Sequence, residues 1–141
     1  FELKRHRMMT QSVQPFSPDL GFAIPSAITR AGLETGFILA MHSAASAYHR
    51  LLSLSPHIAA YVLPNAFNRR VLITMNLRSA EHLVALRSAP NAHFSMRRVA
   101  QRLSDEMKVR APILGQFLRT NSTETWQQIE SHYFSFTNFS A

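Results

Sequence analysis

The spacing of apolar side chains divides most of the chain into helical segments. In residues 31–53, Leu33, Phe37, Met41 and Tyr48 recur at intervals of four or seven positions, which places them on one face of a helix. Similar patterns follow, and proline or polar residues separate them. The pattern predicts helices over residues 31–53, 56–63, 77–88, 92–109, 112–118 and 122–133.

Three of these helices have a recognisable start signal. Ser55-Pro56 joins a good N-cap to a proline that suits the first helical turn. Asn76 precedes the helix over 77–88 and is a plausible cap for it. The segment Asn121–Glu124 resembles a capping box, so we expect the last helix to begin at residue 122.

The helix over 92–109 combines an apolar stripe with a basic face. Every third or fourth residue is apolar, which predicts a core-facing side. The stripe consists of Met96, Val99, Ala100, Leu103 and Met107. We expect Arg97, Arg98 and Arg102 to lie in solvent on the other side.

Strand signals are few. Residues 70–75 are short, apolar and rich in β-branched side chains, which is typical of a strand. Residues 9–28 contain three prolines and should be extended or looped, and residues 134–139 could be a terminal strand or a frayed end. The fold class is therefore α+β, mostly helical, with long helices packed on a small sheet. Because one strand is no complete layer, we expect further strands upstream or in another chain.

Composition and motifs exclude several kinds of chemistry. The chain has no cysteine, so a thiolate nucleophile, a disulfide scaffold and a Cys-ligated metal are ruled out. It has no Gly-rich phosphate loop, no zinc-binding His-Glu-x-x-His and no nucleophilic Gly-x-Ser-x-Gly. We expect no metal site. No apolar run reaches about 18 residues, so no membrane-spanning segment is expected.

The net charge of +7 comes mainly from arginine, since Lys4 and Lys108 are the only lysines. Arginine suits carboxylates and phosphates, which leaves two interpretations: a site for an anionic ligand, or a basic face for nucleic acid. The arginines are dispersed and not interleaved with aromatic residues, so nucleic acid is the weaker interpretation. The chain begins with Phe1 and has no apolar leader, so we expect the C-terminal portion of a longer cytoplasmic protein, forming a single partial domain over residues 1–141.

Two segments carry a family resemblance. The chain opens with Arg5-His6-Arg7, and the predicted strand is followed by a helix that contains Asn76, Arg78, His82 and Arg87. A Val-Leu-Pro-Asn turn at residues 62–65 precedes that strand. In order and spacing, residues 5 to about 110 resemble the flavin-dependent thymidylate synthase family, also called thymidylate synthase-complementing proteins.

The resemblance implies a reaction and a site. The family methylates dUMP reductively to dTMP with FAD, methylenetetrahydrofolate and NADPH, and it is homotetrameric. It implies that Arg87 is the catalytic candidate, holding the pyrimidine of dUMP. The residues implied to bind the flavin cofactor are Arg5, His6, Arg7, Asn76, Arg78 and His82. Expected partners are dUMP or a related anion, together with further copies of the chain or an N-terminal half of the same protein.

The chain also departs from the family signature. Where the signature has Glu, Ser and Arg, this chain has Val13, Pro15 and Ser17, and Ala60 stands in place of another arginine. Lost guanidinium groups imply weak binding of the nucleotide phosphate. We therefore expect a degenerate synthase domain that holds FAD only weakly on its own. The alternatives are a non-catalytic assembly domain, a domain for another nucleotide and, more weakly, a nucleic-acid-binding domain.

Overall fold

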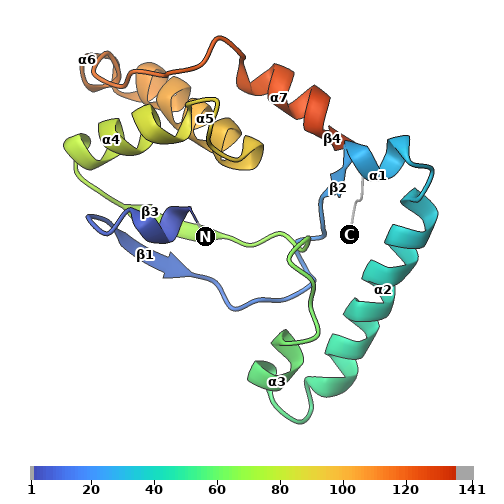
Figure 1. Cartoon of the computed structure of the whole chain (residues 1–141). Coiled ribbons are helices and arrows are strands. Elements are labelled where there is room, and N and C mark those ends of the chain that lie inside the picture. The colour runs from blue at the N-terminus through green and yellow to red at the C-terminus, as the bar shows by residue number, and fades with distance from the viewer. Residues whose placement is uncertain (1, 136–141) are drawn as a thin grey trace. The chain divides into compact units, whose positions relative to one another are not determined.

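The computed structural model describes residues 2–135, whose elements are labelled in Figure 1. They group into two compact units. Of the described residues, the first unit contains 2–11 and 73–133, and the second contains 12–72 and 134–135. The fold is α+β and mostly helical, as the sequence predicts. No helix within residues 2–135 is both long enough and apolar enough to cross a bilayer.

Two small two-stranded sheets are present in the described chain. Strand β3, Val71–Thr74, confirms the predicted strand, and it pairs with β1, Thr10–Val13. Strands β2, Ile24–Pro25, and β4, Phe134–Ser135, are antiparallel. The expectation that the partner strands lie before the start of this chain or in another chain is thus wrong for β3, whose partner β1 belongs to this chain. Residues 134–139 were expected to be a terminal strand or a frayed end. Strand β4 covers the first two of them, and residues 136–139 lie outside the described residues.

In the second unit, the predicted helix over 31–53 begins later, at Glu34, and a short helix that the sequence does not predict precedes it. Helix α1, Ser26–Arg30, ends before Gly32, which has a left-handed φ of +69°. The N–H of Gly32 bonds the carbonyl of Thr29, and the N–H of Leu33 bonds the carbonyl of Ile28. Two such hydrogen bonds around a left-handed glycine commonly end a helix. Helix α2, Glu34–Leu51, then begins independently.

The core of the second unit lies between α2 and the segment that follows it. Helix α3, Pro56–Ala60, begins as predicted at Ser55, whose Oγ accepts from the N–H of His57 at 3.2 Å, but it ends earlier than predicted. Met41 and Tyr48 of α2 are buried against residues of α3 and the chain beyond it. The buried cluster consists of Met41, Tyr48, Ala59, Leu63 and Phe67.

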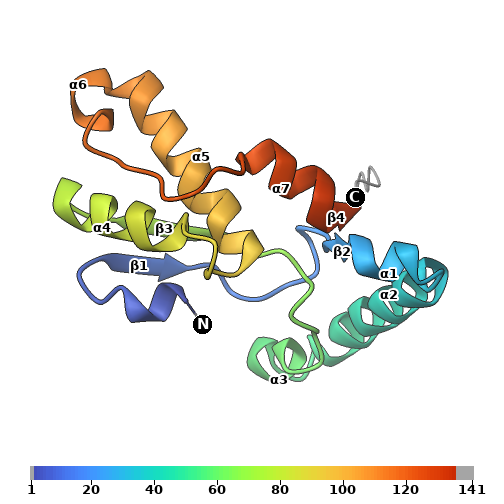
Figure 2. The ribbon, with the colours of Figure 1, turned by 45° about the horizontal axis from the view of Figure 1, so that its top comes forward.

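In the first unit, α5 is the central helix (Figures 1 and 2). It spans Phe94–Arg110 and packs against α4, Leu77–Arg87, α6, Pro112–Gly115, and α7, Trp126–Tyr133. A 3-10 turn, η1, covers Leu3–Arg5. The Oδ1 of Asn76 accepts from the N–H of Ser79 at 2.9 Å, which confirms the predicted cap of α4. The buried cluster of this unit consists of Ala80, Val84 and Leu118.

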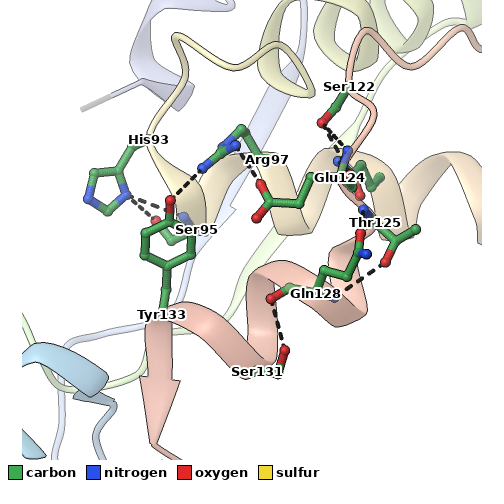
Figure 3. A network of polar contacts seen from close by, with 10 residues as sticks. His93, Ser95, Arg97, Ser122, Glu124, Thr125, Gln128, Ser131 and Tyr133 are labelled. Atoms are coloured by element: carbon green, nitrogen blue, oxygen red, sulfur yellow. Dashed lines mark hydrogen bonds and ion pairs between the residues drawn. The ribbon is translucent and has the colours of Figure 1, made fainter. Parts of the chain in front are cut away.

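The buried face of α5 differs from the predicted stripe. Leu103 and Met107 pack against the core as predicted, but Val99 is half exposed. Arg97, expected in solvent, is buried. Its Nη1 lies 2.8 Å from Glu124 Oε2, and its Nη2 donates to the Tyr133 hydroxyl at 3.4 Å (Figure 3). The buried face of α5 therefore includes Arg97, because Glu124 from a distant segment supplies a carboxylate partner for its charge.

The start of α7 also differs from the prediction. The helix begins at Trp126, four residues later than expected, so the predicted capping box at Asn121–Glu124 is wrong. The actual box is formed by Thr125 and Gln128: each side chain accepts from the other's backbone N–H, at 2.8 and 3.3 Å (Figure 3). Such a reciprocal pair satisfies two of the N–H groups that a helix start leaves without partners.

Candidate functional site

A cavity of about 850 Å³ opens between the N-terminal segment and α4, within the first unit. Its basic side chains come from two places that are far apart in the sequence: residues 5–7 and the helix that begins at Leu77. Six of the seven predicted site residues line it, namely Arg5, His6, Arg7, Arg78, His82 and Arg87. The structure therefore brings together what the sequence places about 80 residues apart.

Helix α4 supplies half of these basic groups. Arg78 and His82 are four residues apart, so they lie on one face, about one turn apart. Arg87 lies nine residues after Arg78, which is about half a turn round the helix. It lines the same cavity nevertheless, and its side chain reaches back to the N-terminal segment.

Arg87 is held by two residues of the N-terminal segment. Its Nε donates to His6 Nε2 at 2.8 Å, and its Nη2 donates to the backbone carbonyl of Glu2 at 3.3 Å. The Glu2 carboxylate lies 3.6 Å from Arg87 Nη1 and accepts from the N–H of His93 at 3.1 Å. Glu2 is therefore part of the site's framework, although no sequence signal pointed to it.

The surroundings of His6 favour its neutral form. Burial lowers its pKa below 6.5, the charges of Arg87 and His82 lower it further, and Glu2 opposes them. The His82 ring lies edge-on to the His6 ring, with the ring centres 5.8 Å apart. Because Nε2 accepts a hydrogen bond from Arg87, the single ring proton must be on Nδ1. A neutral imidazole avoids a further positive charge beside the Arg87 guanidinium.

Asn76, the seventh predicted residue, is not among those that line the cavity. Its side-chain oxygen is engaged in capping α4, and this cap fixes where the helix carrying Arg78 and His82 begins. Asn121, by contrast, lines the cavity although the sequence indicated only a helix start there. Its Nδ2 donates to the carbonyl of Ala85 at 2.9 Å, which ties its loop to α4.

The cavity combines positive charge with apolar surface. Four guanidinium groups face it, and the one carboxylate among its lining residues is Glu81. Met8, Ala85 and Leu86 supply apolar wall. Guanidinium groups bind phosphates through paired hydrogen bonds, while apolar wall accommodates a ring. No cluster of three or more His, Cys, Asp or Glu side chains within residues 2–135 could hold a metal ion.

An α+β fold that gathers arginines and an apolar wall around one cavity is suited to a phosphorylated ligand with an aromatic ring. Comparison with known proteins agrees with this class. The sequence model of the thymidylate synthase complementing protein family, Thy1, matches residues 1–113. The chain belongs to this family, as the resemblance in its sequence implied.

Relatives with high similarity include two proteins described only as UPF0159. The protein of Chlamydia muridarum is 36% identical over 118 residues, and that of Thermoplasma acidophilum is 32% identical over 120 residues. Each match covers 84% of this chain but only 22% and 24% of the relatives, respectively. This chain therefore spans about a quarter of their length.

Flavin-dependent thymidylate synthases also match. The enzyme of Pyrococcus furiosus is 29% identical over 123 residues, which cover 79% of this chain and 50% of that enzyme. A solved structure, the flavin-dependent thymidylate synthase ThyX from Helicobacter pylori complexed with FAD and dUMP, matches with a TM-score of 0.57. The match covers 83% of this chain and 65% of that one at 20% identity, which shows a shared fold.

Proposed function

We propose that this chain is the flavin-binding part of a protein of the flavin-dependent thymidylate synthase type, and that its basic cavity holds the anionic groups of FAD. The observation that carries this proposal is the convergence of six basic side chains from residues 5–7 and α4 on one cavity. The proposal joins that geometry to the family membership of the chain.

The residues present fit such a ligand. Arg5, Arg7 and Arg78 are exposed side chains at the cavity, so they can reach phosphate oxygens without leaving a packed core. Arginine presents several N–H groups in one plane, which matches two phosphate oxygens at once. Met8 and Leu86, also exposed, offer apolar surface to a flat ring. A volume of about 850 Å³ lies within the usual range for cofactor sites.

The chain's own residues would bind and orient rather than react. A bound flavin supplies hydride transfer, and the protein positions it. His82 and His6 add hydrogen-bonding groups beside the guanidiniums, and Arg87 holds His6 in place. For reductive methylation of dUMP we propose that further groups are needed from a second copy or from another part of the same protein, because Ser17 and Ala60 replace two arginines of the family signature.

A titration of the full chain with FAD, followed by flavin fluorescence, tests the proposal. We expect saturable binding that is too weak to survive gel filtration. Arg78→Ala should weaken it about tenfold or more, because a hydrogen bond to a charged group contributes roughly 1.5–3 kcal/mol. The matched control is Arg110→Ala, which removes an exposed arginine outside the cavity lining.

Two results would contradict this function. The first is no saturable change in flavin fluorescence for the unaltered chain at millimolar FAD. The second is an equal loss of affinity in Arg78→Ala and Arg110→Ala, which would show that FAD responds only to net charge.

A further inference from the structure

The guanidinium of Arg87 is committed to the N-terminal segment through all three of its nitrogens. Nε donates to the His6 ring, Nη2 donates to the Glu2 carbonyl, and Nη1 faces the Glu2 carboxylate at 3.6 Å. The side chain of Arg87 is only 14% exposed. An arginine held in this way has little freedom to turn, so its orientation is set by what holds it.

Glu2 makes this arrangement possible by bridging two helices. Arg87 is the last residue of α4, and His93 is the N-cap of α5. One carboxylate oxygen of Glu2 accepts from the N–H of His93, and the other lies near Arg87. That second oxygen, Oε2, is buried and has no hydrogen-bond donor within the described residues, so the charge of Arg87 is what compensates it.

We propose that Glu2 is a positioning residue of the cavity: it fixes the Arg87 guanidinium, whose Nε donor selects the His6 tautomer with the proton on Nδ1. Glu2 is not among the residues that line the cavity, so it acts through Arg87 and His6. This assignment rests on the proposed function only in one respect, which is that FAD is the ligand of the cavity.

The chemistry of the imidazole makes the assignment measurable. A neutral histidine carries one ring proton, and the hydrogen bond at one nitrogen decides which nitrogen carries it. The fixed Nε donor of Arg87 occupies Nε2 of His6 and so selects the Nδ1 tautomer. Without the carboxylate, Arg87 loses its counter-charge and can turn away, which leaves Nε2 free to take the proton.

Nitrogen NMR of the imidazole rings in the full chain at pH 8 tests this, with Glu2→Gln as the variant. Gln keeps the shape of Glu2 but removes the charge. We expect His6 to be protonated on Nδ1 in the unaltered chain and predominantly on Nε2 in Glu2→Gln. The matched control is Glu106→Gln, which removes an exposed carboxylate paired with Arg110 and should leave the His6 signals unchanged.

A second variant keeps the test decisive if Glu2→Gln does not fold. Glu2→Asp retains the charge, but its shorter side chain cannot reach both Arg87 and His93, so it should shift the His6 tautomer partway. The proposal is overturned if His6 of the unaltered chain carries its proton on Nε2, or if the folded Glu2 variants retain the Nδ1 tautomer. FAD titration of the unaltered chain decides the proposed function separately, because the tautomer measurement needs no ligand.

Discussion

At the scale of single residues, the environment of His6 makes the stability of the folded chain depend on pH. Its pKa is lowered by burial and by the charges of Arg87 and His82, against the opposing effect of Glu2. In the unfolded chain its pKa should be near the ordinary 6.5. As pH falls, the unfolded chain therefore binds a proton at His6 before the folded chain does, and folding becomes less favourable.

This difference predicts how stability depends on pH. The contribution of His6 to the free energy of unfolding is constant above the unfolded pKa of about 6.5. It falls as pH drops from there through the lowered folded pKa, below which the loss is complete. In urea unfolding between pH 8 and pH 5, His6→Gln should lose less stability than the unaltered chain. His57→Gln, at an exposed residue of α3, is the control and should keep the full pH dependence. Identical pH profiles for the unaltered chain and His6→Gln would contradict this prediction.

The buried ion pair of Arg97 shows what a local pattern cannot predict. An arginine between apolar positions on a helix is typical of a solvated face. Arg97 is buried because Glu124, 27 residues later, lies 2.8 Å from it, and because the Tyr133 ring lies close to its guanidinium. The sequence around residue 97 contains no sign of either partner. Buried charges depend on such distant partners, so they are found only once the fold is known.

At the scale of elements, the segments with strong local signals could be predicted. The strand at β3 has a run of apolar, β-branched residues, and α4 follows the N-cap Asn76. Strand β1 was missed because Thr10–Val13 is largely exposed and shows no alternation of apolar and polar residues. Helix α1 was missed because its five residues are too few to show an apolar period. Helix α2 begins three residues later than predicted because the left-handed backbone of Gly32 separates it from α1.

The contact between α6 and α5 gives a prediction for one glycine. Gly115 is buried at the end of α6, and a Cβ placed there would lie 2.5 Å from Lys108 Cα and 2.6 Å from Lys108 N. These are backbone atoms of α5, which cannot move aside without disturbing the helix. Gly115→Ala should therefore lower the free energy of unfolding by about 1–3 kcal/mol, as other overpacked sites do.

Urea unfolding of Gly115→Ala measures this cost, with Gly36→Ala as the control. Gly36 lies within α2, and nothing is within 4 Å of a Cβ placed there. Because alanine favours a helix over glycine by roughly 0.5–1 kcal/mol, Gly36→Ala should leave the protein equally or more stable. If Gly115→Ala is as stable as Gly36→Ala, α6 does not pack as closely on α5 as described.

At the scale of the whole chain, four arginines that are dispersed in the sequence meet at one cavity. The net charge of +7 gave no location for a site. The family resemblance supplied seven residues. Six of them line the cavity, and the seventh, Asn76, caps α4 instead. Glu2 and Asn121 lie outside the residues that carry the resemblance. Their roles come from contacts with α4 and α5 that only the folded chain reveals.

The distribution of arginines also predicts how strongly the chain binds dUMP. The cavity takes its basic groups from residues 5–7 and from α4, whereas Ser17 and Ala60 stand where the family signature has arginines for the nucleotide phosphate. A buried phosphate without such partners is costly. Losing two charge-assisted hydrogen-bond partners, at roughly 1.5–3 kcal/mol each, should weaken binding by about two to four powers of ten.

We therefore expect calorimetry of the full chain with dUMP to give no affinity in the micromolar range, and we expect the chain alone to make no dTMP. FAD in the same buffer is the matched ligand, because it is also anionic but is proposed to bind the cavity arginines that this chain retains. Arg87→Ala should leave this weak dUMP binding nearly unchanged, since the guanidinium of Arg87 is already engaged by His6 and Glu2. Micromolar affinity for dUMP that Arg87→Ala abolishes would show that Arg87 leaves those partners for the nucleotide, and that the substitutions at residues 17 and 60 do not impair the site.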